Sequence, residues 1–216
     1  MLDIVQTKAN FNMEWVACCG EEVISVAKSP FERGQFNIYV DFRDSLNQRM
    51  YFNPSDKTWG TKLKDRMSFK LFEGEDKIGY IVGQPKKIGF LKSYLYYEFE
   101  YKGKLYLGYE VGFGSNGLFF CIYEGEHTIA IVTKNLHVEN FKDKYTAYLI
   151  DEKYASVVIL FTLYYDSVAF GDKGEVAVFS IQRQGVNTIQ KELIAKFDTA
   201  FIPAVLAMEE EKNKAT

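Results

Sequence analysis

The sequence predicts a mainly β fold with some helix (β+α): a closed antiparallel β-barrel of about 10–12 strands around a buried apolar helix, with a small helical addition at the C-terminal end. Three observations predict it. Short runs that alternate apolar and polar residues follow one another up to residue 150, with tight turns between them. Residues 154–170 are instead apolar on every side. An aromatic content of 16%, carried by 18 Phe and 15 Tyr, also favours strands.

The alternating runs are predicted strands. The beginning of the chain, up to about residue 20, has no clear period. Alternation is visible in residues 22–28, 35–42, 49–52, 66–73, 78–82, 94–102, 105–113, 118–124, 127–134, 136–141 and 144–150. Turns are expected at residues 74–76, at Lys102-Gly103, at 114–117 and at Gly125-Glu126. Closely spaced antiparallel strands favour a barrel or a sandwich, and closure into a barrel leaves no unpaired edge.

Residues 152–170 are predicted to form a helix that is buried on all sides. Asp151 can cap its N-terminus, and Gly171 suits the position just after its end. The apolar run is about 17 residues long, at the lower limit for a bilayer span. Asp166 lies within it, together with two adjacent tyrosines, and no basic cluster flanks it. A core helix is therefore favoured over a membrane segment.

The C-terminal part changes character. Residues 175–183 alternate as one more strand. The segment from Asn187 to Phe201 then predicts an amphipathic helix, with an apolar stripe of Ile189, Leu193, Ile194, Phe197 and Phe201. Asn187 and Gln190 stand at capping-box spacing, and Pro203 is expected to kink or restart the helix. We thus expect a barrel domain at 1–184 and a helical extension at 185–216.

Residues 118–151 (LFFCIYEGEHTIAIVTKNLHVENFKDKYTAYLID) and 154–166 (YASVVILFTLYYD) give a characteristic order of elements. A strand, an acidic-Gly turn, a strand ending in lysine and a Tyr-bearing strand precede the apolar helix. This order resembles the tubby C-terminal-like superfamily, which comprises the tubby domain, the LURP-one-related proteins and the phospholipid scramblases. The resemblance covers about residues 20–171 and implies a barrel with a helix threaded through it. The chain departs from the family by continuing 45 residues past Gly171.

Composition narrows the setting. The formal net charge of −3 gives no global attraction to nucleic acid. Three cysteines, Cys18, Cys19 and Cys121, make no disulfide framework, which favours a reducing, cytoplasmic location. The N-terminal segment lacks the charged and continuous apolar regions of a signal peptide.

Few residues suggest catalysis. Residues 112–117 match G-x-G-x-x-G, but a strand follows where a dinucleotide site needs a helix, and the other kinase motifs are missing. His127 and His137 are the only histidines and no Cys-x-x-Cys accompanies them, so no zinc site is expected. A Cys121–His127 dyad is conceivable across a hairpin, and Glu98 with Glu100 is read as a solvated strand face. We expect no enzyme, no metal and no cofactor.

Charge is distributed unevenly. Eleven basic and six acidic residues lie between Lys57 and Lys104, a balance of +5 that leaves −8 for the remainder. The predicted site is a basic patch formed by Lys62, Lys64, Arg66, Lys70, Lys86, Lys87 and Lys92. Such patches attract anionic lipid headgroups, and the resemblance implies the same, since tubby domains hold phosphoinositide headgroups with basic residues. Ordinary solvated lysines are the plainer reading. The alternative function is a protein-interaction module that docks a partner through Asn187 to Phe201, and the oligomeric state stays open.

Overall fold

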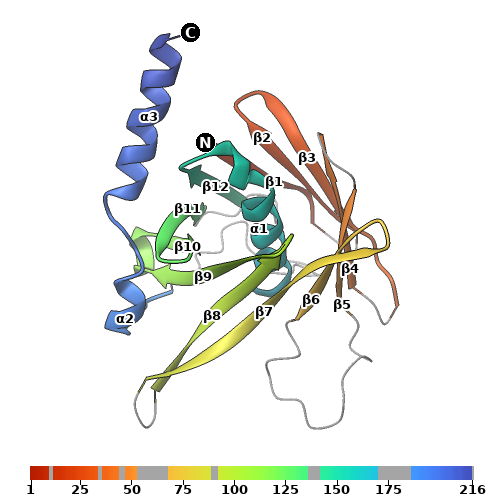
Figure 1. Cartoon of the computed structure of the whole chain (residues 1–216), viewed down its shortest axis with the longest axis horizontal. Helices are drawn as coiled ribbons and strands as arrows, with labels where there is room; N and C mark the ends of the chain where they lie inside the picture. The colour runs from red at the N-terminus through yellow and green to blue at the C-terminus, as the bar shows by residue number, and fades with distance from the viewer. Residues whose placement is uncertain are drawn as a thin grey trace, which may run out of the picture.

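The computed structural model describes residues 1–9, 12–33, 36–43, 47–52, 68–88, 92–135, 142–169 and 186–215. These residues include twelve strands that close into one antiparallel barrel (Figure 1). Each strand pairs with its neighbours in sequence, and β1 pairs with β12 to complete the ring. The strands are β1 (Leu2–Lys8), β2 (Met13–Cys19), β3 (Glu22–Ser29), β4 (Phe36–Phe42), β5 (Gln48–Phe52), β6 (Phe69–Glu73), β7 (Asp76–Ile88), β8 (Lys92–Tyr101), β9 (Lys104–Gly112), β10 (Leu118–Glu124), β11 (His127–Lys134) and β12 (Lys144–Leu149). The predicted closed antiparallel barrel is confirmed.

Turn chemistry explains why consecutive strands pair. Lys102 and Gly103 both have positive φ, 49° and 78°, between β8 and β9. Two such residues form the tight hairpin turn whose twist matches that of the strands, and glycine adopts it without steric cost. The predicted turn at Lys102-Gly103 is therefore confirmed. The predicted strands at 136–141 and 175–183 lie outside the described residues.

The beginning of the chain contains two strands that were not predicted from the sequence. Strands β1 and β2 occupy residues for which no period was predicted. Their buried positions do alternate, as Leu2, Ile4 and Gln6 on β1 and as Met13, Trp15 and Ala17 on β2. The sequence does not show this alternation clearly, for two reasons. A polar residue, Gln6, is buried on β1, and two apolar residues, Val5 and Val16, take half-buried positions between the buried ones. Buried polar groups, described below, form hydrogen bonds with that glutamine.

Helix α1 (Ala155–Ala169) follows the last strand, after a single 3-10 turn at Glu152–Tyr154. Asp151 caps this turn as predicted, because its Oδ1 accepts the backbone N–H of Lys153 at 2.9 Å. Every residue from 157 to 166 is at most 4% exposed. The expected cap at Gly171 lies outside the described residues. Among the described residues no helix combines the length and the apolar character of a membrane span.

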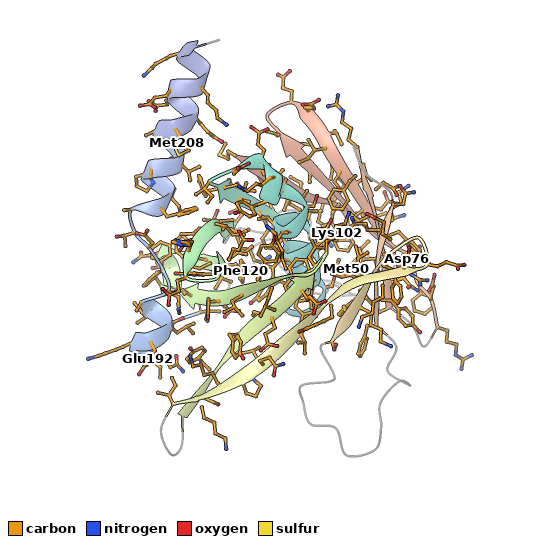
Figure 2. The ribbon with its side chains drawn as sticks, in the orientation of Figure 1. Met50, Asp76, Lys102, Phe120, Glu192 and Met208 are labelled. Carbon is orange, nitrogen blue, oxygen red and sulfur yellow. The ribbon has the colours of Figure 1, made fainter. Side chains whose placement is uncertain are left out.

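Helix α1 contacts side chains from strands around the barrel. Its aromatic rings meet Phe69 of β6, Tyr97 of β8 and Phe120 of β10, with ring centroids 5.4, 5.7 and 4.0 Å from those of Tyr164, Phe161 and Tyr165. Figure 2 labels Phe120 and, on β5, Met50, which are both buried. Gly108 of β9 lies so close to Phe161 that a Cβ there would be 2.5 Å from the ring. Helix and inward-facing strand residues form one apolar cluster.

A second apolar cluster lies on the outer face of β8 to β11, beneath the C-terminal segment. Tyr109, Cys121 and Ile131 belong to it, together with Leu193 and Phe201 from the segment itself. The segment is built from α2 (Lys191–Ile194) and α3 (Phe201–Ala215), and it crosses the outside of the barrel (Figure 1).

The predicted helix from Asn187 to Phe201 is thus wrong in extent. Residues 186–188 are instead extended, because they pair with the end of β9: Thr188 N–H donates to the Gly112 carbonyl at 2.9 Å. Only Lys191–Ile194 is helical before the chain turns again. Asp198 Oδ1 then accepts the N–H of Ala200 at 2.9 Å, and the next helix starts with Pro203 in its first turn, where proline is tolerated.

Strands β7 and β8 extend beyond the strands that pair with them on either side. In the part of the chain that the structure describes, β6 pairs with β7 only as far as Ile81, and β9 pairs with β8 only as far as Tyr97. The β7–β8 ladder nevertheless continues to Ile88 and Lys92. Residues 82–88 and 92–96, here named the β7–β8 arm, therefore project past the barrel as a two-stranded ribbon (Figure 1).

Candidate functional site

The predicted basic patch divides into two parts. Lys62, Lys64 and Arg66 lie outside the described residues. Lys70 is exposed on β6, where its neighbours Phe69 and Leu71 point inward, so it lies on the outer face. Lys86 and Lys87 are exposed on the β7–β8 arm, and Lys92 begins β8 opposite Ile88.

Strand register separates Lys70 from the arm. Lys70 pairs with Tyr80 of β7, and Lys86 lies six residues further along the same strand. At about 3.3 Å per residue that is roughly 20 Å, about two Debye lengths at physiological salt. The structure therefore brings Lys86 and Lys87 of the predicted patch together. Lys92, the first residue of β8, pairs with Ile88, the last residue of β7.

The β7–β8 arm combines positive charge with aromatic and apolar groups. Its sequence (VGQPKKI and KSYLY) contains three lysines and no acidic residue. Lys86 pairs with Tyr94, whose ring centroid is 6.0 Å from the Lys86 Nζ. Leu95 is 38% exposed. Because side chains alternate along a strand, Lys86 and Lys87 point to opposite faces, and the arm is positive on both.

The nearest carboxylate on these strands is already engaged. Tyr96 O–H donates to Glu98 Oε1 at 2.8 Å, and Gln84 Nε2 donates to Glu98 Oε2 at 3.2 Å. Burial, together with this bond to Glu98, raises the pKa of Tyr96 to about 12, so the tyrosine keeps its proton. Glu98 therefore anchors the base of the arm and is not directed at the lysines of its tip.

The catalytic alternatives do not assemble among the described residues. Cys121 is fully buried, and burial raises the pKa of its thiol to about 12, which suppresses the thiolate. In the β10–β11 register Cys121 lies opposite Ile131, while His127 is opposite Glu124 at the exposed turn, so the Cys121–His127 dyad is wrong. Residues 114–116 form a 3-10 turn that leads into a strand. No group of three or more potential metal ligands occurs within the described ranges.

A buried polar cluster, made up of Gln6, Trp15, Lys134, Asp143, Tyr145 and Asp166, is the feature that sequence reasoning missed. Trp15 Nε1 donates to Asp166 Oδ2 at 3.0 Å, and Tyr145 O–H donates to Asp166 Oδ1 at 2.6 Å. Lys134 forms an ion pair with Asp143. The two hydrogen bonds join α1 to β2 and β12, and the ion pair joins β11 to the residue before β12. The only sequence signal was Asp166 itself, an acid inside an apolar run.

The cluster holds one cation and two carboxyl groups. Burial, and then the charge of Asp143, raises the pKa of Asp166 to about 7. A proton on Asp166 therefore takes the place of a second cation over much of the physiological pH range. A second ionised carboxylate would be costly in this buried site. Asp143 N–H also donates to Gln6 Oε1 at 3.1 Å, which explains the inward glutamine of β1. The arrangement is suited to fixing α1 against β2 and β12.

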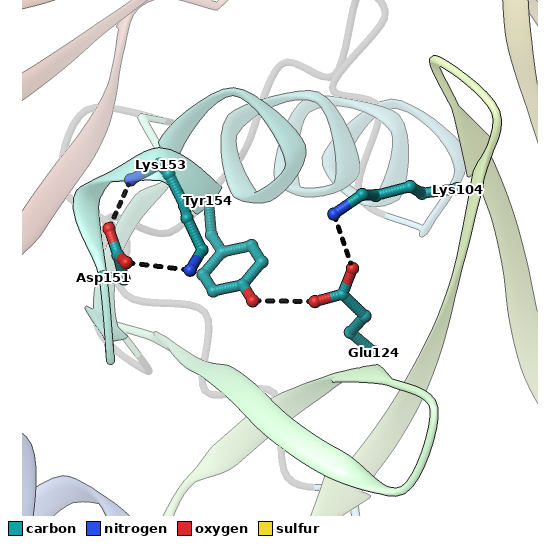
Figure 3. A network of polar contacts seen from close by, with 5 residues as sticks. All are labelled: Lys104, Glu124, Asp151, Lys153 and Tyr154. Atoms are coloured by element: carbon teal, nitrogen blue, oxygen red, sulfur yellow. Dashed lines mark hydrogen bonds and ion pairs between the residues drawn. The ribbon is translucent and has the colours of Figure 1, made fainter.

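Polar contacts also hold the start of α1 to the rim (Figure 3). Tyr154 O–H donates to Glu124 Oε2 at 2.7 Å, and Lys104 Nζ lies 3.1 Å from Glu124 Oε1. Lys153 and Asp151 form a neighbouring ion pair at 2.9 Å. The hydrogen bond from Tyr154 and the lysine charge lower the pKa of Glu124, so the carboxylate is ionised at neutral pH.

The C-terminal residues predicted to face a partner pack on the barrel instead. Phe197 lies between the rings of Phe113 and Phe119, at centroid distances of 5.3 and 4.5 Å, and Leu193 and Phe201 are buried. Of the predicted apolar stripe, Ile189 is the residue left in solvent, at 79% exposure.

Comparison of the chain with protein-family models, with curated proteins and with solved structures gave no match.

Proposed function

We propose that this protein is a non-enzymatic binding module that engages anionic lipid headgroups at a membrane surface through the β7–β8 arm. The observation that carries the proposal is the projection of a ribbon with three lysines and no carboxylate beyond an otherwise acidic barrel. A lysine near an anionic membrane surface contributes about 1 kcal/mol. Three lysines then contribute about 3 kcal/mol, or roughly 100-fold in partition.

The geometry of the arm suits an approach by its tip. Lys86 and Lys87 point to opposite faces, so neither face alone collects the charge. Leu95 adds an exposed apolar side chain next to them, while Tyr94 is buried and holds the arm to the outer apolar cluster. A barrel held in this way stays in water while the arm lies among the headgroups.

Vesicle flotation tests the proposal. The full chain should float with vesicles of phosphatidylcholine and phosphatidylserine at low salt, but not with phosphatidylcholine alone. Flotation should fall as salt rises, because exposed charges are screened within about 8 Å at physiological ionic strength. Changing Lys86, Lys87 and Lys92 to Ala should reduce the bound fraction by roughly 100-fold in partition coefficient.

A matched variant tests whether membrane binding depends on the lysines of the arm or on the number of lysines in the whole protein. Lys28 and Lys77 are exposed lysines on β3 and at the opposite end of β7, and Lys191 is exposed on α2. Changing these three to Ala removes the same charge and should leave flotation nearly unchanged. Equal loss in both triple variants would show nonspecific attraction. Absence of flotation of the unmodified protein at low salt would end the proposal.

The proposal includes two further elements. We propose that α1 occupies the barrel interior, as the resemblance to the tubby C-terminal-like superfamily implies; its contacts with β2, β6, β8, β10 and β12 support this. We also propose a cytoplasmic, peripheral membrane location, in keeping with three free thiols.

The alternative function is binding of a protein partner by Asn187 to Phe201. Such a partner would have to contact Ile189 or displace the segment from the barrel.

A further inference from the structure

Three buried titratable side chains, none of them on the β7–β8 arm, lie together where β11 ends and β12 begins. They are the amine of Lys134 and the carboxyl groups of Asp143 and Asp166, and each residue is at most 5% exposed. The Lys134 amine and the Asp143 carboxyl group form an ion pair. An amine and a carboxyl group held in contact away from solvent are the two reactants of an amide bond.

The backbone holds both of these groups in place. Lys134 pairs with Tyr145 in the β11–β12 ladder, and Asp143 lies two residues before Tyr145. Gln6 fixes Asp143 from β1: its N–H donates to the Asp143 carbonyl at 2.9 Å, and its Oε1 accepts the Asp143 N–H at 3.1 Å. Oriented groups of this kind react as if at effective concentrations of about 10⁵–10⁸ M. The fold therefore supplies the encounter that condensation in solution lacks.

The surroundings of the ion pair are aromatic. The Lys134 Nζ lies 5.0 Å from the centroid of the Tyr145 ring, and Tyr145 and Trp15 are both fully buried. Burial disfavours the charged forms of an amine and of a carboxyl group, and so brings the neutral pair that reacts within reach. Exclusion of water also opposes hydrolysis of an amide once it has formed.

Asp166 is placed to carry the proton that the reaction requires. Its two oxygens accept hydrogen bonds from Trp15 and Tyr145. Burial raises the pKa of Asp166 to about 7, and the charge of Asp143 and a hydrogen bond with the Asp143 carboxyl group add to this effect. A carboxyl group that both accepts and releases a proton near neutral pH suits general acid–base catalysis.

We propose that Lys134 and Asp143 condense to an intramolecular amide (isopeptide) bond, with Asp166 as the proton carrier. Proton transfer within the ion pair gives the neutral amine and the neutral acid, and Lys134 Nζ attacks Cγ of Asp143. The ionised Asp166 accepts a proton from the nitrogen and returns it to the leaving hydroxyl oxygen. The Cγ–O bond then breaks with its electron pair on that oxygen, and one water leaves. No oxidant or reductant takes part, and the reaction occurs once per chain.

Mass spectrometry of the full chain tests the bond. The folded protein should be lighter than its sequence mass by one water molecule. Cleavage after glutamate separates residues 127–139, which contain Lys134, from residues 140–152, which contain Asp143. These two peptides should stay joined, and fragmentation should place the link at Lys134 and Asp143. Full sequence mass with separate peptides would overturn the proposal. Loss of one water without joined peptides would do the same, because cyclisation of an aspartate explains it.

A matched pair of lysine variants identifies the amine. In Lys134→Arg the positive charge beside Asp143 is kept, but a guanidinium that stays protonated is no nucleophile. This variant should have full sequence mass and separate peptides, with folding checked by circular dichroism. Lys144, next to Asp143, is exposed and lies 3.1 Å from Asp3. Lys144→Arg should link as the unmodified protein does. Joined peptides in Lys134→Arg would refute the assignment.

Asp166→Asn tests the proton carrier. Intact mass followed during cell-free synthesis gives the rate at which the linked fraction grows. This rate should fall by about 100-fold or more, as expected for loss of general acid–base catalysis. Equal rates in a folded Asp166→Asn variant would contradict the proposal. Lys134→Arg should float with anionic vesicles as the unmodified protein does, so the amide bond and the membrane contact can fail independently.

Discussion

Replacing Gly108 by alanine should destabilise the barrel by inserting one methyl group where α1 packs. An ideal Cβ at this position would lie 2.5 Å from Cε2 and Cζ of Phe161, and 3.4 Å from Cβ of Tyr97. The Phe161 ring cannot withdraw easily, because it is buried and its centroid is 5.7 Å from that of Tyr97. Overpacking of this kind costs about 1–3 kcal/mol.

A smaller effect opposes this cost. Alanine restricts the unfolded chain relative to glycine, which stabilises the protein by about 0.4–1 kcal/mol where the backbone permits it. The net loss for Gly108→Ala should therefore be about 1–2 kcal/mol. For a chain of this size the melting temperature then falls by about 2–8 °C, at roughly 2–4 °C per kcal/mol.

Urea unfolding followed by circular dichroism measures the effect, and Gly83→Ala is its control. A Cβ at Gly83 would lie 3.4 Å from a methyl of Leu95, an ordinary contact with a side chain that can move. We expect a change within about 0.5 kcal/mol there.

A double-mutant cycle tests whether Phe161 is the cause. Phe161→Leu alone should cost about 1 kcal/mol, and the double variant Gly108→Ala with Phe161→Leu should be less destabilised than the sum of the two, with a coupling of about 1 kcal/mol. If Gly108→Ala is neutral, or if the two changes simply add, Phe161 does not occupy the space above Gly108 and the packing of α1 is misplaced.

Three further outcomes follow from the buried residues. The pKa of Asp166 is raised in the folded state, so protonation of Asp166 stabilises the fold fully below about pH 4, and this stabilisation is lost as the pH rises to about 7. The variant Asp166→Asn should therefore lose less stability between pH 5 and pH 7.5 than the unmodified protein. Urea unfolding at the two pH values measures the difference. Leu160→Asp should abolish folding in water, because it buries an unpaired charge costing several kcal/mol, whereas Leu206→Asp on the exposed side of α3 should give normal yield and circular dichroism. Removing residues 186–216 should expose Cys121, so that its thiol, refractory in the full chain, reacts with a maleimide; continued protection would show that the C-terminal segment is not its cover.

Local pattern was enough to predict most of the barrel. The sequences of β4 and β8 alternate apolar and polar residues, and the Lys102-Gly103 turn follows from residue chemistry. The helix was predictable because an apolar run bounded by Asp151 has no strand period. Strands β1 and β2 were not, since Gln6 takes an inward position that only Asp143, far along the chain, makes favourable.

The candidate sites depend more on tertiary structure than on pattern. Lys70 and Lys86 look close in sequence, but their separation is set by strand register. The segment around Leu193 has a helical apolar stripe, yet pairing of residues 186–188 with β9 overrides that propensity.

Closure of the barrel constrains the order in which the chain can fold. The seam between β1 and β12 joins residues as far apart as Leu2 and Ala147, which are separated by 145 positions. The twelve described strands precede helix α1 in the chain, so its contacts with β6, β8 and β10 form only after these strands are made. All other pairings among the described strands join consecutive strands, so closing this one long-range seam is expected to be a slow step of folding. A nascent chain that ends before residue 155 has the twelve strands that the structure describes and none of the side chains of α1. Its unpaired edges make that stage of synthesis the one most exposed to aggregation.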